Sequence, residues 1–119
     1  MSVMEHRVQR DGFVDLKFRG TLIGFGSSFE EGRTRWFELR IFITDNDKFV
    51  VSGTGVTTYP DERNRNWAYV CNDVDDVVDV LHREDEDGIR FLTNTARDAL
   101  EQASRYVPEF DDALAEEIA

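Results

Sequence analysis

Within the first 71 positions, hydrophobic and polar residues alternate in the runs 14–19 and 35–44, and β-branched residues are frequent in 48–58. A period of two is typical of β-strands that bury one face. The strands that this pattern predicts are 14–19, 21–25, 35–44, 48–58 and 67–71. The second of them follows the first through Gly20, and is either its hairpin partner or a bent continuation of it.

The run 35–44 has the clearest alternation, and it divides the strand into two faces. Phe37, Leu39, Ile41 and Ile43 share the face expected to be the core, and Trp36, Glu38, Arg40, Phe42 and Thr44 share the other. Residues 45–47, Asp-Asn-Asp, predict a turn. Gly53 and Gly55 interrupt the returning strand, which indicates a bulge or a close backbone approach.

The hydrophobic period changes to 3.6 after residue 71, which predicts helices. Val74, Val77, Val78 and Leu81 form the first stripe, and Asn72 or Asp73 is placed to cap it. The second stripe runs through Ile89, Leu92, Ala96, Ala99, Leu100, Ala103 and Tyr106, and its helix starts either at Asp87 or within 93–95. Pro108 is expected to open a third, short helix with Phe110, Leu114 and Ile118 on one face.

Strands followed by helices predict an α+β fold: an antiparallel, twisted sheet of about five strands, with two to three C-terminal helices packed on one face. The length of 119 residues fits a single domain. We expect residues 1–71 to form the sheet and residues 72–119 to form an acidic helical part. The second face of the sheet is then either free for contact or covered, at Trp36 and Phe42, by the N-terminal segment or the third helix.

The net charge of −11 is divided unevenly along the chain. Residues 1–70 contain ten basic and ten acidic side chains, whereas residues 71–119 contain four arginines and fifteen acidic side chains. Genome composition, adaptation to salt and function are all possible origins of this acidity. No apolar run approaches the ~20 residues that cross a bilayer, so we expect a soluble, cytoplasmic protein that does not bind membranes.

Few residues suggest catalysis or a cofactor. Cys71 is the single cysteine, His6 and His82 are the only histidines, and no group of them has the spacing of metal ligands. Residues 20–28, rich in glycine and serine, lack the lysine of a Walker loop, so we expect their glycines to twist or bulge a strand. We therefore predict no catalytic, cofactor-binding or metal-binding residue.

A cluster of arginine and aromatic residues is the first candidate site. Its members are Trp36, Arg40 and Phe42 on one strand, with Arg33, Arg35, Arg63, Arg65 and Trp67 nearby in sequence. These residue types are enriched in protein interfaces and also stack on single-stranded nucleic acids. Binding of a nucleic acid depends on positive charge, and the first 70 residues have no net charge. Binding of a nucleic acid is therefore less favoured than binding of a protein. The sequence predicts a non-enzymatic regulatory module that binds a protein partner or a second copy of itself.

The acidic half of the chain supports an alternative from another class. Carboxylates spaced along a ridge can imitate a nucleic acid and block the basic groove of a DNA-processing or defence enzyme. The residues that would form this surface are Asp73, Asp75, Asp76, Asp79, Glu84, Asp85, Glu86 and Asp87, extended by acidic residues within 109–117. An enzyme of unassigned chemistry, built around His6, His82 or Cys71, is the third hypothesis.

Several short segments resemble a known family. They are Phe18-Arg19-Gly20-Thr21-Leu22-Ile23-Gly24, Ser27-Ser28, the aromatic strand that ends at Thr44, and Lys48-Phe49-Val50. In these segments the chain resembles the C-terminal domain of the EXLDI family, small proteins of actinobacteria and their mobile elements. The similarity covers about residues 13–51, with an echo in the acidic helix at 74–81. It implies a free-standing accessory domain and assigns a role to no residue.

Overall fold

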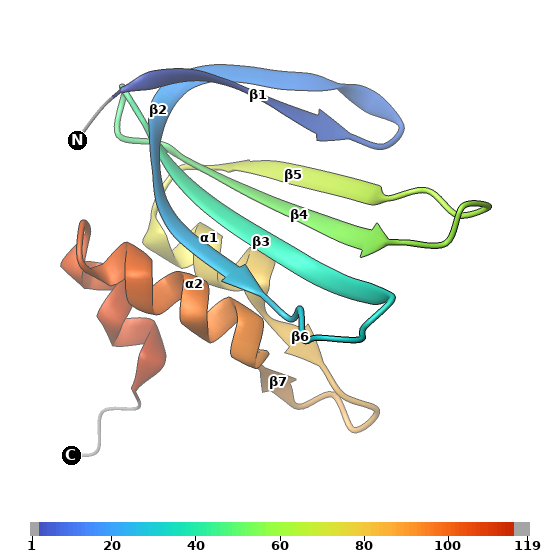
Figure 1. Ribbon diagram of the computed structural model, residues 1–119. Helices are drawn as coiled ribbons and strands as arrows, with labels where there is room; N and C mark the ends of the chain where they lie inside the picture. The colour runs from blue at the N-terminus through green and yellow to red at the C-terminus, as the bar shows by residue number, and fades with distance from the viewer. Residues whose placement is uncertain (1–2, 116–119) are drawn as a thin grey trace.

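A computed structural model describes residues 3–115 and confirms the α+β prediction (Figure 1). Five strands come first: β1 Met4–Arg10, β2 Phe13–Ser27, β3 Arg35–Thr44, β4 Phe49–Thr57 and β5 Arg65–Cys71. The remaining elements are α1 Val74–Leu81, β6 Arg83–Glu84, β7 Arg90–Phe91, α2 Asn94–Ser104 and the 3-10 helix η1 Pro108–Leu114. Within this part of the chain, no helix has both the length and the apolar character needed to cross a membrane.

The sheet is an antiparallel meander in the order β1-β2-β3-β4-β5, and it curls because β2 bends. The first part of β2 pairs with β1 and the second part pairs with β3, with an irregular register between Leu22 and Gly24. The runs 14–19 and 21–25 are therefore one bent strand. The expected total of five strands is correct because β1, which the sequence pattern did not indicate, takes the fifth place.

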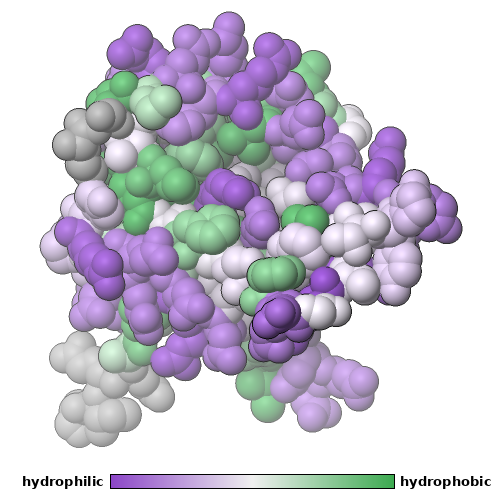
Figure 2. Space-filling model, in the orientation of Figure 1, coloured by the Kyte–Doolittle hydropathy of each residue, from purple (hydrophilic) through white to green (hydrophobic). Residues whose placement is uncertain are grey.

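The main core lies between the sheet and the helices, which cover one face as expected (Figure 1). Ile41 and Val51 from the sheet, Val77 and Leu100 from the helices and Phe110 from η1 are all fully buried. Asp73 caps α1 by accepting a hydrogen bond from the backbone N–H of Asp76 at 2.8 Å. Hydrophilic residues predominate on the outer side of α2 (Figure 2).

Gly24 and Gly26 allow α2 to lie directly on β2. A Cβ atom at Gly24 would collide with the carbonyl oxygen of Ala99, and one at Gly26 with that of Thr95. The register shift between Leu22 and Gly24 agrees with the expectation that the glycines of this segment shape a strand.

The second face of the sheet is not free for contact; the alternative in which the N-terminal segment covers Phe42 is the correct one. The β1–β2 hairpin folds across it, as the upper layer in Figure 1. The rings of His6 and Phe18 pack on Phe42 with centroid distances of 4.7 and 5.1 Å, and Phe42 is only 4% exposed. These side chains form a second, smaller apolar layer inside the curl.

The tip of this hairpin is attached to the far strand of the sheet. The backbone N–H of Asp11 donates to the carbonyl oxygen of Asn66 at 2.9 Å, and the N–H of Asn66 donates to the carboxylate of Asp11 at 3.1 Å. The curl is therefore held at both ends, by the bend in β2 and by this contact.

The segment between the helices is a small β-hairpin, which the sequence pattern missed. Arg83 pairs with Phe91 and Glu84 with Arg90, so Ile89, assigned to the second helical stripe, lies in the turn and is 62% exposed. Of the two predicted starts of the second helix, the later one is correct, since Thr93 caps α2. The third helix is a 3-10 helix that buries Phe110, and Ile118 lies outside the described residues.

Candidate functional site

The arginine and aromatic residues selected from the sequence do not share one face. The register places Leu39, Gly53 and Trp67 side by side across β3, β4 and β5, and Leu39 belongs to the core under the helices. Trp67 is therefore on the helix side of the sheet, and the same alternation puts Arg35 and Arg65 there. Trp36, Arg40 and Phe42 point to the opposite side, so the expectation of a single face is wrong.

Phe42 is also wrong as a contact residue, because the β1–β2 hairpin buries it. Arg40 is engaged within the chain: it donates to Glu38 at 3.0 Å and lies over the ring of Phe25 at 5.0 Å. The indole N–H of Trp36 donates to the same Glu38 at 3.0 Å, and its ring packs on Phe29. These contacts indicate a structural role for Arg40 and a partly structural one for Trp36.

Trp67 covers Gly53, because a Cβ at Gly53 would collide with the indole ring. Tyr69 lies next to it at a centroid distance of 5.8 Å, and the guanidinium of Arg83 from β6 lies 6.0 Å from the indole. Trp67 therefore joins the small hairpin to the sheet.

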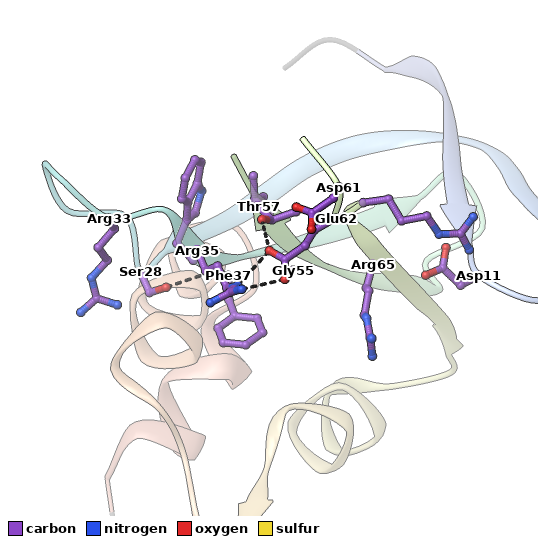
Figure 3. Close-up of a pocket in the computed structure, with 13 residues that line it drawn as sticks. Asp11, Ser28, Arg33, Arg35, Phe37, Gly55, Thr57, Asp61, Glu62 and Arg65 are labelled. Carbon is purple, nitrogen blue, oxygen red and sulfur yellow. Dashed lines mark hydrogen bonds and ion pairs between the residues drawn. The ribbon is translucent and has the colours of Figure 1, made fainter. Parts of the chain in front are cut away.

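The four other arginines gather around one hollow at the end of the sheet farthest from the β3–β4 turn (Figure 3). We call it the arginine hollow; its volume is about 840 Å³. Its lining includes Arg33, Arg35, Arg63 and Arg65, with Ser28, Trp36, Phe37, Gly55, Val56, Thr57, Asp11, Asp61 and Glu62. The antiparallel pairing of Arg35 with Thr57 brings the 28–34 loop beside the 58–64 loop.

One arginine of the hollow is fixed by a bidentate ion pair. Arg35 donates to the two carboxylate oxygens of Glu62 at 3.0 and 2.6 Å, and the Thr57 hydroxyl donates to Glu62 at 2.7 Å. These hydrogen bonds, first from Arg35 and then from Thr57, lower the pKa of Glu62. The ring of Tyr59 stacks under the Arg35 guanidinium at 4.7 Å. The rim of the hollow is therefore ordered by contacts within the chain.

Phe37 is the residue of this site that the sequence pattern missed. It was assigned to the core with Leu39 because both lie on one face of β3, yet it is 66% exposed. Its ring lies over Gly55, 3.7 Å from where a Cβ would be, and Figure 3 shows it on the same side of the sheet as Arg65. The helices cover only the far part of this face.

Half of the eight acidic residues proposed for a nucleic-acid mimic have side chains with local structural contacts. Asp73 caps α1, Asp76 accepts from the N–H of Asn72, and Asp79 pairs with Arg90 at 3.0 Å. Asp85 accepts from the N–H groups of Asp87 and Ile89, which closes the β6–β7 turn. Glu84 lies opposite Arg90 in that hairpin, and Asp75, Glu86 and Asp87 carry exposed side chains. Glu116 and Glu117 lie outside the described residues.

Asp73 and Asp75, at the start of α1, lie around the same hollow as two carboxylates from another segment. Together with Glu109 and Asp112 of η1, they line a hollow of about 440 Å³. No group of three or more His, Cys, Asp or Glu side chains within residues 3–115 is arranged to hold a metal ion.

The residues considered for catalysis lie in three separate places. Cys71 is 2% exposed, and burial, with Asp76 and Asp73, raises its pKa to about 11, so its thiol is protonated at neutral pH. His6 has its Nε2 3.1 Å from the carbonyl oxygen of Gly20, under the β1–β2 hairpin. His82 ends α1. No pair of these side chains forms an acid–base or nucleophilic arrangement.

No family model, no curated protein and no solved structure matches this chain. The resemblance to the EXLDI family therefore stays a prediction from short segments, and the functional argument depends on the geometry of the site.

Proposed function

We propose that this protein is a small non-enzymatic interaction module that binds a protein partner, or a second copy of itself, through the arginine hollow. The observation that carries the proposal is the exposure of Phe37, near the start of β3, in a hollow lined by four arginines. A large aromatic side chain beside guanidinium groups is the combination that contributes most of the energy in protein interfaces.

Binding experiments with a matched pair of variants test this proposal. The tagged protein is compared with Phe37→Ala/Arg65→Ala and with the control Arg97→Ala/Tyr106→Ala. The control removes one arginine and one aromatic ring, both exposed, from the helical side of the molecule. Partners captured from the native lysate, and self-association measured by sedimentation velocity, should be lost in the first variant and retained in the control. Capture and sedimentation that are identical for all three proteins would refute the proposal.

The meeting of α1 and η1 carboxylates favours a second candidate function, an acidic inhibitor that imitates a nucleic acid. Such a surface would bind a strongly basic groove, and its affinity would fall steeply with added salt. Asp75→Asn/Asp112→Asn should weaken binding of this kind and leave binding through the arginine hollow unchanged. Direct binding of nucleic acids and an enzymatic activity are the less favoured proposals.

A further inference from the structure

We propose that the segment that occupies the arginine hollow is an acidic peptide, with carboxylates on Arg63 and Arg65 and an apolar side chain on Phe37. This inference rests on the proposed function and names the chemistry of the partner. The molecule carries a net charge of −11, yet the hollow is lined by four arginines and three acidic residues. The lining is therefore far less acidic than the molecule as a whole.

Two of the four arginines form no close ion pair, although the charge of one of them, Arg65, helps to lower the pKa of Glu62. Arg35 is neutralised by Glu62, and Arg33 lies 3.6 Å from the carboxylate of Glu30. Within the described part of the chain, Arg63 and Arg65 are exposed and make no ion pair within 4 Å. A partner carboxylate can therefore bind either guanidinium without displacing an internal one, and bidentate pairing suits that geometry.

The apolar part of the site lies beside Arg65. Phe37 is 66% exposed and lies over Gly55. The Cβ of Arg65 is 3.9 Å from the Cβ position of that glycine, so the arginine stem and the phenyl ring border the same spot on β4. An apolar side chain of the partner can cover this spot while its neighbouring carboxylates reach the guanidinium groups.

The acidic residues of the hollow favour a peptide over a nucleic acid. Asp11, Asp61 and Glu62 lie among the arginines, where they would repel the closely spaced phosphates of a polynucleotide. A peptide can place a few carboxylates on Arg63 and Arg65 and keep uncharged groups elsewhere. Local complementarity of this kind provides specificity in protein association.

Selection from a phage-displayed library of random 12-residue peptides tests the inference. The wild-type protein and Arg63→Glu/Arg65→Glu are used as baits, and circular dichroism checks that both are folded. We expect the wild type to enrich peptides that contain Asp or Glu next to an apolar residue, and the charge-reversed variant to enrich Lys and Arg instead. Synthetic copies of the enriched acidic peptides should bind the charge-reversed variant at least about tenfold more weakly.

Other outcomes of these measurements distinguish failure of the acidic-peptide inference from failure of the proposed interaction module. Enrichment of uncharged apolar peptides that need Phe37 but not Arg63 would overturn the acidic partner and leave the interaction module intact. Peptides that bind Phe37→Ala/Arg65→Ala as well as the wild type would overturn both. If a 20-nucleotide single-stranded DNA binds more tightly than the selected peptides, the occupant of the hollow is a nucleic acid and not an acidic peptide. If Arg63→Glu/Arg65→Glu abolishes self-association, the occupant is a second copy of the chain.

Discussion

Replacing Phe42 by alanine tests whether the β1–β2 hairpin covers the sheet. Phe42 is 4% exposed and packs on the rings of His6 and Phe18. Removal of a buried phenyl ring costs about 3–5 kcal/mol, from a total stability on the order of 5–15 kcal/mol. For a chain of this length, such a loss lowers the melting temperature by about 10–20 °C.

Urea denaturation followed by tryptophan fluorescence measures this loss, and Phe37→Ala is the matched control. Phe37 has the same side chain on the same strand but is 66% exposed, so its replacement should change the free energy of unfolding by less than about 0.5 kcal/mol. Amide hydrogen exchange in β1 should accelerate more than in α2, because the hairpin loses its main contact. A Phe42→Ala protein within about 1 kcal/mol of the wild type would refute the covered face.

Three other predictions follow from the packing. Because the pKa of Cys71 is about 11 in the folded protein and about 8.5 in an unfolded chain, the free energy of unfolding should fall as pH rises between these values. The fall should amount to at most about 3 kcal/mol. Urea titrations at pH 8–10.5 should show this dependence of the unfolding free energy on pH in the wild type and not in Cys71→Ala. An equal pH dependence in both proteins would contradict burial of the thiol. Gly24→Ala should lower the stability by about 1–3 kcal/mol in thermal unfolding, because α2 must shift away from β2. Gly55→Ala should lower it by less, because an added Cβ there makes only ordinary contacts. The reverse order would contradict the close approach of α2 to β2. Asp73→Ala should lower the free energy of unfolding by about 1 kcal/mol, because the cap of α1 is lost. In the same thermal melts, Asp75→Ala should lower it by only a few tenths of a kcal/mol. Equal losses would exclude a capping role for Asp73.

Local sequence signals were enough to predict α1. The stripe of Val74, Val77, Val78 and Leu81 and the capping position of Asp73 depend only on residues within one short segment. The turn at 45–47 was likewise predictable, and Asp47 has a positive φ of 59° there. Each of these features is set by neighbours in the chain.

The sequence offered the β1–β2 layer only as one alternative, because the residues that this layer contacts are distant in sequence. His6 occupies an inward position of β1, so this strand lacks the simple apolar alternation of β3. The bend at Gly24 is set by the backbone of α2, which lies more than 70 residues later. The β6–β7 hairpin was hidden because Ile89 and Leu92 happen to continue a helical spacing with the residues of α2.

The arginine hollow was predicted in part. The sequence grouped the four arginines only by their nearness along the chain, and the pairing of β3 with β4 brings them around one hollow. The period of two shows which side chains share a face, but it does not show how far the helices extend over that face. Phe37 was therefore assigned to the core, although it is exposed.

The attachment of Asp11 to Asn66 has a consequence for synthesis of the chain. These residues are separated by 55 positions, so a nascent chain cannot make the contact until β5 has left the ribosome. Until then the tip of the β1–β2 hairpin has no partner, and the hairpin stays more open to chaperones and proteases than in the folded protein. Because contacts of long sequence separation form slowly, we expect docking of the first strands to be among the last events of folding.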